Sequence, residues 1–200
     1  GTSDFGVPST PEGWAQLVGK VLQAYLHTGQ SFTYSTHQLE TVTPPAGSLD
    51  RSLDSAGALQ RSIQDMCNVL DKRQGRQLRS IDCCDLACIL GQITDSTALR
   101  RSAMMALADP WDTEYLQAKR YGHQDVPNWR CYANFTVVCA DTATLAPEFW
   151  LPFEEGGECF GLATLQLCQS HGRLADPPCE DPELLGLNPC SEQPLANRQI

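Results

Sequence analysis

The chain has 200 residues, of which 42% are hydrophobic and 19% are charged, and its formal net charge at pH 7 is −10. This composition excludes an intrinsically disordered protein, which combines high charge with few apolar residues. Nucleic-acid binding needs many Lys and Arg side chains to displace counterions from phosphates, whereas this chain has 14 of them against 24 Asp and Glu. No apolar run approaches the ~18 residues that a membrane span requires. We therefore predict neither a nucleic-acid partner nor membrane insertion.

The first half of the chain is predicted to be helical. Apolar residues recur at helical spacing from Trp14 to Leu26, so we expect a helix over residues 11–27. Ser9 and Glu12 match the capping-box pattern and would begin this helix. The same spacing predicts further helices over residues 48–70, 82–90, 96–107 and 111–121.

The pattern changes after Gly122. Over residues 129–139, the odd-numbered positions are all apolar and the even-numbered positions are mostly polar. This period of two, together with the aromatic and β-branched residues, is typical of a strand. A helix remains an alternative there, because Cys131 and Cys139 also fall near one helical face. The tail over residues 175–194 contains five prolines, so we expect it to be extended.

Ten cysteines lie in the last two thirds of the chain. No C-x2-C pair typical of zinc sites occurs, and we predict no metal site. Their even number instead predicts disulfides and an oxidising compartment, with the pairing left open. The predicted half-cystines are Cys67, Cys83, Cys84, Cys88, Cys131, Cys139, Cys159, Cys168, Cys179 and Cys190.

These features together predict a mainly α fold, a disulfide-rich helical bundle with a short β or irregular segment and an extended C-terminal strap fastened by disulfides. We expect one extracellular domain over residues 1–200. Residues 11–122 would form its helical base. Residues 123–200, rich in cysteine and proline, would pack on that base.

Two short motifs fit a secreted protein. Asn134-Phe135-Thr136 matches the acceptor pattern for N-glycosylation, which predicts a glycan on Asn134. Lys72 and Arg73 form a dibasic pair that a processing protease of the secretory pathway could cleave. The alternative interpretation of this pair is a solvated basic loop.

Aromatic residues gather between positions 111 and 153 and supply the candidate binding surface. Aromatic side chains dominate the energetics of many protein interfaces, so this segment could contact a protein partner. The alternative is that the run from Phe149 to Phe153 fills the core. The candidate contact residues are Trp129, Tyr132, Phe149, Trp150 and Phe153.

No catalytic residue is predicted, because the chain lacks a G-x-S-x-G elbow, an H-E-x-x-H zinc pair, a P-loop and a G-x-G-x-x-G turn. We expect no cofactor, and a binding protein rather than an enzyme. The predicted function is that of a secreted or cell-surface glycoprotein, a ligand or receptor ectodomain, that binds an extracellular protein. One alternative is a secreted carrier of a small apolar ligand, with the stripe from Trp14 to Leu26 as its cavity wall. The other is a secreted hydrolase whose site assembles from distant residues.

Overall fold

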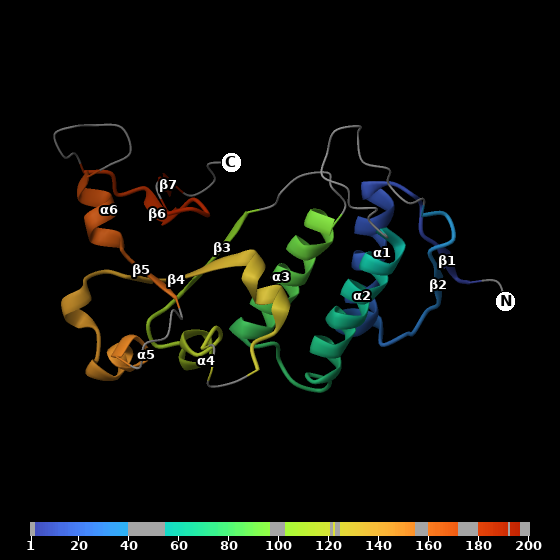
Figure 1. The fold of residues 1–200 in the computed structure, drawn as a ribbon, viewed down its shortest axis with the longest axis horizontal. Helices are drawn as coiled ribbons and strands as arrows, with labels where there is room; N and C mark the ends of the chain where they lie inside the picture. Colours follow the sequence, from blue (N-terminus) through green and yellow to red (C-terminus); the bar gives the residue numbers. More distant parts are fainter. Residues whose placement is uncertain are drawn as a thin grey trace. The chain divides into compact units, whose positions relative to one another are not determined.

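The fold is given by a computed structural model of the chain. It forms two compact units, Gly1–Ser102 and Ala103–Ile200, which are described in turn (Figure 1). That the whole chain acts as a single domain stays a prediction. The structure describes residues 3–39, 55–96, 103–120, 122, 125–154, 160–171, 180–191 and 193–196.

The first unit is built from three long helices, α1 (Pro11–Gln23), α2 (Ser55–Asp71) and α3 (Ser80–Ser96). Helix α2 contacts both α1 and α3. Two short strands, β1 (Phe5–Gly6) and β2 (Tyr34–Ser35), pair in parallel. Apolar side chains from all three helices form the core: Leu17, Val21, Leu59, Ile63, Met66, Leu70, Ile81, Ile89 and Ile93.

The helix predicted over residues 11–27 is present, and its start is set by Thr10. The Thr10 hydroxyl accepts a hydrogen bond from the backbone N–H of Gly13 at 3.1 Å, which satisfies one of the donors left free in a first helical turn. The predicted cap at Ser9 is therefore one residue too early. Helix α1 continues into a π-helical turn, Ala24–Thr28, and ends at Gly29, whose φ of 64° lies in the left-handed region.

The start of α3 is set by a carboxylate. The backbone N–H of Arg79 donates to the Asp82 carboxylate at 2.8 Å, as in the second half of a capping box. The guanidinium of Arg79 lies 2.7 Å from Asp82, and that of Arg73 lies 3.1 Å from it. The hydrogen bond from Arg79 lowers the pKa of Asp82 below its usual range. The predicted helices over 48–70 and 82–90 match α2 and α3, although residues 48–54 lie outside the described residues.

The second unit contains a three-stranded parallel sheet in the order β3-β4-β5. Its strands are β3 (Met104–Ala108), β4 (Ala133–Cys139) and β5 (Gly161–Thr164). The central strand β4 is buried along most of its length, as parallel strands covered on both faces are. The strand predicted over 129–139 is thus present, from Ala133 onward.

Short helices and a hairpin complete this unit. The helices are α4 (Thr113–Leu116), α5 (Leu151–Glu154) and α6 (Leu165–His171), of which α6 follows β5 directly. An antiparallel hairpin is formed by β6 (Leu184–Leu187) and β7 (Pro194–Ala196). Short 3-10 turns cover Asn128–Tyr132, Thr142–Thr144 and Pro147–Trp150.

The predicted mainly α, disulfide-rich bundle is wrong. The helix expected over 96–107 is replaced in part by strand β3, and the helix expected over 111–121 shrinks to α4. The apolar run Met104–Ala108 is too short for its periodicity to distinguish a buried strand from a helix. Pairing with β4 makes this segment a strand. The predicted C-terminal strap contains a hairpin instead.

The cysteines are thiols wherever the structure describes them. A disulfide requires two Cα atoms about 4.4–6.8 Å apart, and a count of cysteines carries no such distance. Cys159 and Cys179 lie outside the described residues. The half-cystine prediction is wrong for the eight cysteines that are described, none of which forms a disulfide: Cys67, Cys83, Cys84, Cys88, Cys131, Cys139, Cys168 and Cys190.

Candidate functional site

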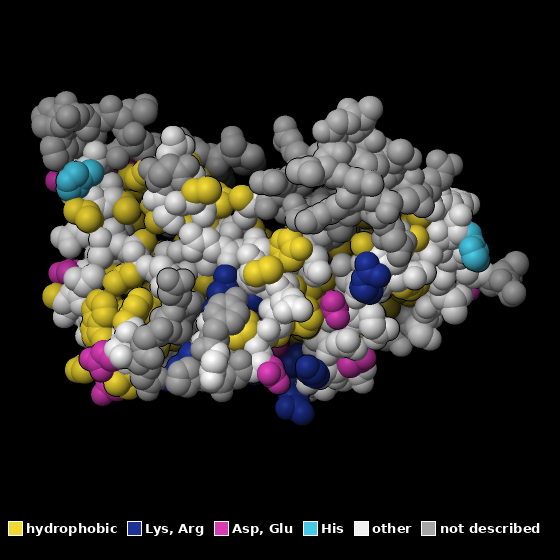
Figure 2. Space-filling model, in the orientation of Figure 1, with side chains coloured by type: hydrophobic (Ala, Val, Ile, Leu, Met, Phe, Trp, Pro, Cys, Tyr) yellow, Lys and Arg dark blue, Asp and Glu magenta, His cyan; other side chains and the backbone are white. Residues whose placement is uncertain are grey.

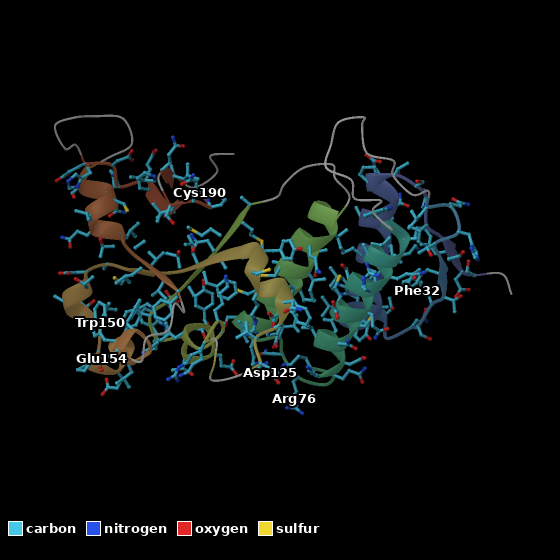
Figure 3. The ribbon with its side chains drawn as sticks, viewed as in Figure 1. Phe32, Arg76, Asp125, Trp150, Glu154 and Cys190 are labelled. Carbon is cyan, nitrogen blue, oxygen red and sulfur yellow. The ribbon has the colours of Figure 1, made fainter. Side chains whose placement is uncertain are left out.

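The turn of the β6–β7 hairpin presents a cysteine to solvent. The backbone N–H of Ser191 donates to the carbonyl of Asn188 at 2.9 Å, which closes a β-turn with Pro189 in its second position. Cys190 occupies the third position and is exposed (Figure 3). The turn therefore presents a thiol at its tip.

Two hydrogen bonds between Asn188 and Gln193 stabilise this turn. The backbone N–H of Asn188 donates to the carbonyl of Gln193, and the N–H of Gln193 donates to the side-chain oxygen of Asn188, each at 2.9 Å. Ser191 has a φ of 69°, in the left-handed region. Non-glycine residues adopt this conformation at a cost of about 1–2 kcal/mol. Backbone strain of this kind is common at functional sites and needs support from its surroundings.

A cavity of about 420 Å³ lies between this turn, the parallel sheet and α6. Its volume falls within the range of small-molecule sites, about 300–1,000 Å³. Its wall combines hydroxyl and amide side chains with leucine and alanine side chains. The lining residues are Asn134, Thr136, Gly161, Leu162, Ala163, Thr164, Leu167, Cys168, Leu187 and Ser191.

Strands β4 and β5 approach closely at the wall of this cavity. Thr136 is paired with Gly161 in the ladder. A Cβ atom on residue 161 would lie 2.8 Å from the Thr136 hydroxyl oxygen, well inside normal contact distance. Glycine at position 161 therefore leaves room for the hydroxyl of Thr136, which donates to the Asn134 side-chain oxygen at 3.2 Å.

The two thiols near the cavity differ in their surroundings. Cys168 is half-buried in the wall, and burial raises the pKa of its thiol. Burial therefore disfavours the thiolate of Cys168, which is the nucleophilic form of a cysteine. Cys190 is exposed at the hairpin turn. Of the two, Cys190 is the thiol that a reactant can approach from solvent.

The predicted aromatic contact residues divide into two groups. Phe149, Trp150 and Phe153 contact one another, with ring centroids 5.1 to 6.3 Å apart. Phe160 joins this cluster through Phe149 at 5.4 Å and Phe153 at 5.0 Å. Phe149 is buried, whereas Phe153 is 40% exposed. Figure 2 shows apolar side chains at the surface over α5. Trp129 and Tyr132, both half-buried, lie on the separate turn Asn128–Tyr132.

The other predicted sites also have defined places. The side-chain nitrogen of Asn134, the predicted glycan acceptor, donates to the carbonyl of Pro189 at 3.1 Å and to the hydroxyl of Ser191 at 3.3 Å. Lys72 is exposed. Arg73 donates to the carbonyl of Gln77 at 2.6 Å besides its contact with Asp82. The basic loop is thus partly held by hydrogen bonds.

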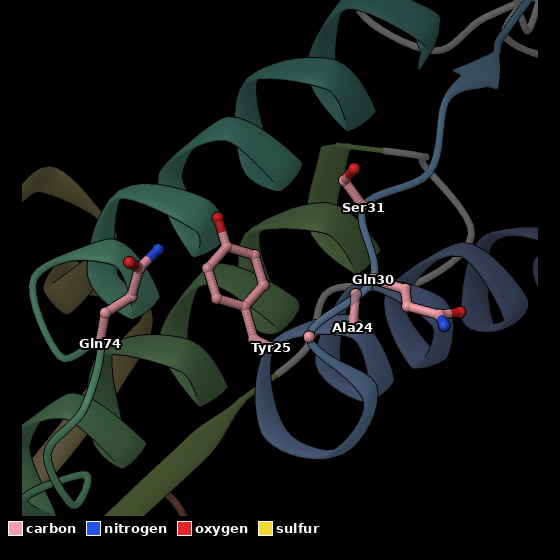
Figure 4. Close-up of a pocket in the computed structure, with 6 residues that line it drawn as sticks. Ala24, Tyr25, Gln30, Ser31 and Gln74 are labelled. Atoms are coloured by element: carbon pink, nitrogen blue, oxygen red, sulfur yellow. The ribbon is translucent and has the colours of Figure 1, made fainter.

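A second cavity, of about 400 Å³, lies in the first unit (Figure 4). The hydroxyl of Tyr25 donates to Asp71 at 2.8 Å, and the side chain of Gln74 donates to the same oxygen at 3.0 Å. Burial, with the hydrogen bond to Asp71, raises the pKa of Tyr25. The residues lining this cavity carry neutral polar or apolar side chains: Ala24, Tyr25, Gly29, Gln30, Ser31 and Gln74.

Sequence reasoning missed the role of the hairpin turn. The even number of cysteines predicts Cys190 to be a half-cystine and does not indicate that it lies on an exposed turn. Asn188 followed by Pro189, between the apolar segments that form β6 and β7, is a turn signal that could have revealed the hairpin. Among the described residues, no cluster of three or more His, Cys, Asp or Glu could hold a metal ion. No helix in the described ranges has the length and apolar character to span a membrane.

The sequence of this chain is similar to those of known enzymes. The chain is 26% identical over 205 residues to the adenosylcobalamin-dependent ribonucleoside-triphosphate reductase of Levilactobacillus brevis. The chain is similar to reductases. The enzymes of the same name from Lacticaseibacillus paracasei and Lactobacillus leichmannii are 26% and 25% identical over 200 and 202 residues. Each alignment covers 96% of this chain and 26% or 27% of the reductase. The chain thus spans about a quarter of the length of these relatives.

No protein-family model matches the chain. No solved structure matches it either. The similarity to the reductases therefore rests on sequence, and the structural description rests on this chain alone.

This similarity overturns the predicted function. The prediction of a secreted or cell-surface glycoprotein that binds an extracellular protein is wrong, as are its two secreted alternatives, because the relatives are nucleotide reductases. The predicted extracellular partner and the predicted secretion are wrong for the same reason. Three sequence features are compatible with secretion: the even number of cysteines, the N-x-T triplet and the dibasic pair. Each of them also occurs by chance in proteins that are not secreted.

Proposed function

We propose that this chain is part of a ribonucleoside-triphosphate reductase that works inside the cell. The observation that carries the proposal is the alignment of 96% of the chain with reductases of that specificity. Thiols rather than disulfides at the eight described cysteines support an intracellular location, since disulfides are rare in reducing compartments.

The proposed chemistry requires a source of electrons. Replacing a ribose hydroxyl by hydrogen, with loss of water, consumes two electrons and two protons. Oxidation of two thiols to a disulfide releases the same number of each. Exposed, unoxidised cysteine is therefore the side chain of this protein that suits such a reaction, and thiol–disulfide exchange can restore it afterwards.

Cys190 is the candidate for one of the two thiols that this oxidation consumes, and a small dithiol reductant supplies the other. A mixed disulfide would form between Cys190 and the dithiol, and the second thiol of the reductant would then release Cys190 as a thiol. Cys190 is exposed, it lies on a strained turn, and its neighbour Ser191 lines the 420 Å³ cavity. The hydroxyl of Thr164 on the cavity wall suits the hydroxyl groups of a ribose. Among the described residues that line this cavity, none is Lys or Arg, so the triphosphate of a substrate would have to be held by other residues.

The cavity does not fit adenosylcobalamin. A corrin ring with its attached nucleoside groups is much larger than the ligands for which cavities of about 300–1,000 Å³ are typical. A cavity of about 420 Å³ cannot enclose it. We therefore derive no step through this cofactor from the described residues.

The proposal is tested with the full-length protein. It should reduce ribonucleoside triphosphates in the presence of adenosylcobalamin and a dithiol, and Cys190→Ser should lower kcat at least about a thousandfold, as loss of an essential reacting group does. Cys83→Ser and Cys131→Ser are the controls, because both residues are also exposed. Absence of reductase activity in the unmodified protein would refute the proposed function. Full activity of Cys190→Ser would refute only the assignment of this thiol.

A further inference from the structure

We infer that Asn134 and Thr136 are positioning residues that hold the turn bearing Cys190 against the parallel sheet. The inference rests on the proposed function for its catalytic consequence. Its physical basis is a continuous set of hydrogen bonds from strand β4 to the hairpin turn.

Asn134 forms hydrogen bonds to the residues on both sides of Cys190 in the turn. Its side-chain nitrogen donates to the carbonyl of Pro189 at 3.1 Å and to the hydroxyl of Ser191 at 3.3 Å. These two residues flank Cys190 in the chain. One amide group therefore holds the backbone of Pro189 before the thiol and the side chain of Ser191 after it, and Ser191 is the residue with the strained backbone.

The orientation of the Asn134 amide follows from its partners. A carbonyl oxygen can only accept a hydrogen bond, so the nitrogen of Asn134 must face Pro189. The oxygen of Asn134 then faces the opposite way, where it accepts from the hydroxyl of Thr136 at 3.2 Å. Thr136 thereby favours the one amide orientation that can hold the turn.

Thr136 is itself held firmly. Its residue is only 2% exposed, and its backbone N–H donates to the hydroxyl of Tyr115 at 3.0 Å. Gly161, on the neighbouring strand, leaves the space that the Thr136 hydroxyl occupies. The support for Cys190 therefore begins in the core of the unit and ends at its surface.

The spacing of the two residues explains why they act together. Side chains at positions i and i+2 of a strand point to the same face of the sheet. Asn134 and Thr136 have this spacing in β4, so the hydroxyl reaches the amide. The Asn-x-Thr triplet that predicted a glycan is thus a hydrogen-bonded pair in the folded chain.

Loss of a positioning residue should change the rate of the reaction, kcat, more than it changes substrate binding. A displacement of about 1 Å at a reacting group can lower the rate about a hundredfold. We expect Asn134→Ala to lower kcat of the full-length protein by about 10- to 100-fold, with KM changed much less. Thr136→Val, which keeps the shape of the side chain and removes the hydroxyl, should have a smaller effect in the same direction. Thr136→Ser keeps the hydroxyl and should restore most of the activity.

A structural readout separates positioning from a general loss of stability. In Asn134→Ala, amide hydrogen exchange at Ser191 and Gln193 should become about fivefold faster or more, since a hydrogen bond contributes about 1 kcal/mol net. Exchange in strand β3 should stay within about twofold of the unmodified protein. Asn134→Asp, which keeps the volume and removes the donor, serves if Asn134→Ala does not fold.

The outcomes distinguish the two proposals. Unchanged kcat in Asn134→Ala, with Cys190→Ser inactive, overturns the positioning role and leaves the proposed function intact. Full activity in Cys190→Ser overturns the proposed role of the thiol, and the exchange rates then still test whether Asn134 holds the turn. Unchanged exchange at Ser191 and Gln193 overturns the inference whatever the activity.

Discussion

The hydroxyl of Tyr115 accepts a hydrogen bond from the backbone N–H of Thr136 at 3.0 Å. The same hydroxyl donates to the carbonyl of Ala106 at 2.5 Å, so a side chain from α4 bridges the neighbouring strands β3 and β4. Tyr115 is fully buried, and its ring stacks on Phe135 with centroids 4.9 Å apart. Since Thr136 also orients Asn134, this buried tyrosine supports both the sheet and the turn that bears Cys190.

Tyr115→Phe tests this bridge. The substitution removes this partner from the buried N–H of Thr136 and from the partly buried carbonyl of Ala106, which should lower the free energy of unfolding by about 1–3 kcal/mol. Urea unfolding monitored by far-UV circular dichroism measures the loss. Tyr34→Phe, which removes the same atom in the first unit, is the control. An unfolding free energy unchanged in Tyr115→Phe would show that the bridge does not stabilise the sheet.

The Asp82 carboxylate should make the stability of the first unit depend on pH. Hydrogen bonding from Arg79 lowers the pKa of Asp82 in the folded state. The resulting stabilisation is present above the unfolded pKa of about 3.9 and is lost as the pH falls through the lower folded value. Asp82→Asn should therefore cost about 1 kcal/mol at pH 7, a modest value because Arg79 is exposed, and the cost should shrink in acid.

Asp65 is the control for this prediction, because its pKa is shifted in the direction opposite to that of Asp82. Burial raises the pKa of Asp65, so ionisation of this carboxyl above its unfolded pKa opposes folding. Asp65→Asn should leave stability at pH 7 unchanged or increase it, as measured by urea unfolding across a pH series. If both variants lose stability equally at pH 7, the carboxylate contacts of Asp82 are not the source of its effect.

Two Gly→Ala substitutions should have opposite effects. At position 161 the new Cβ would lie 2.8 Å from the Thr136 hydroxyl, so we expect a loss of about 1–3 kcal/mol from overpacking. At position 19, an exposed site within α1, the new Cβ would meet no atom within 4 Å apart from its chain neighbours and the backbone of its own helix, so alanine should stabilise the helix by about 0.5–1 kcal/mol. Thermal unfolding of the two variants measures both signs, and equal shifts would contradict the packing argument.

Trp150→Ala tests whether the aromatic cluster is part of the core. The Trp150 ring meets the buried Phe149 edge to face, with centroids 5.1 Å apart. Truncation removes this contact and half-buried apolar area, so we expect a loss of about 1–3 kcal/mol and a lower Tm. Trp111, 75% exposed, is the matched control, and Trp111→Ala should stay within about 0.5 kcal/mol. An unchanged Tm in Trp150→Ala would argue against a core role.

Long periodic segments could be predicted from the sequence alone. The helical spacing that begins at Trp14 yields α1, and the alternation over residues 129–139 yields β4. The segment Met104–Ala108 could not be predicted, because five apolar residues carry no period and only pairing with β4 makes them a strand. The candidate site was missed for a related reason: Asn134 and Ser191 are far apart in the chain and meet only in the folded unit.

The sequence by itself therefore determined the local elements whose side-chain period is long enough to define a buried face, and it excluded a disordered chain. The tertiary structure alone decided the parallel sheet, the state of the described cysteines and the grouping of Asn134, Thr136 and Cys190 around one turn. The physical reason is distance. Periodicity reports which face of an element is apolar, whereas strand pairing, disulfide formation and a hydrogen-bonded site depend on which distant residues come within a few ångströms of each other.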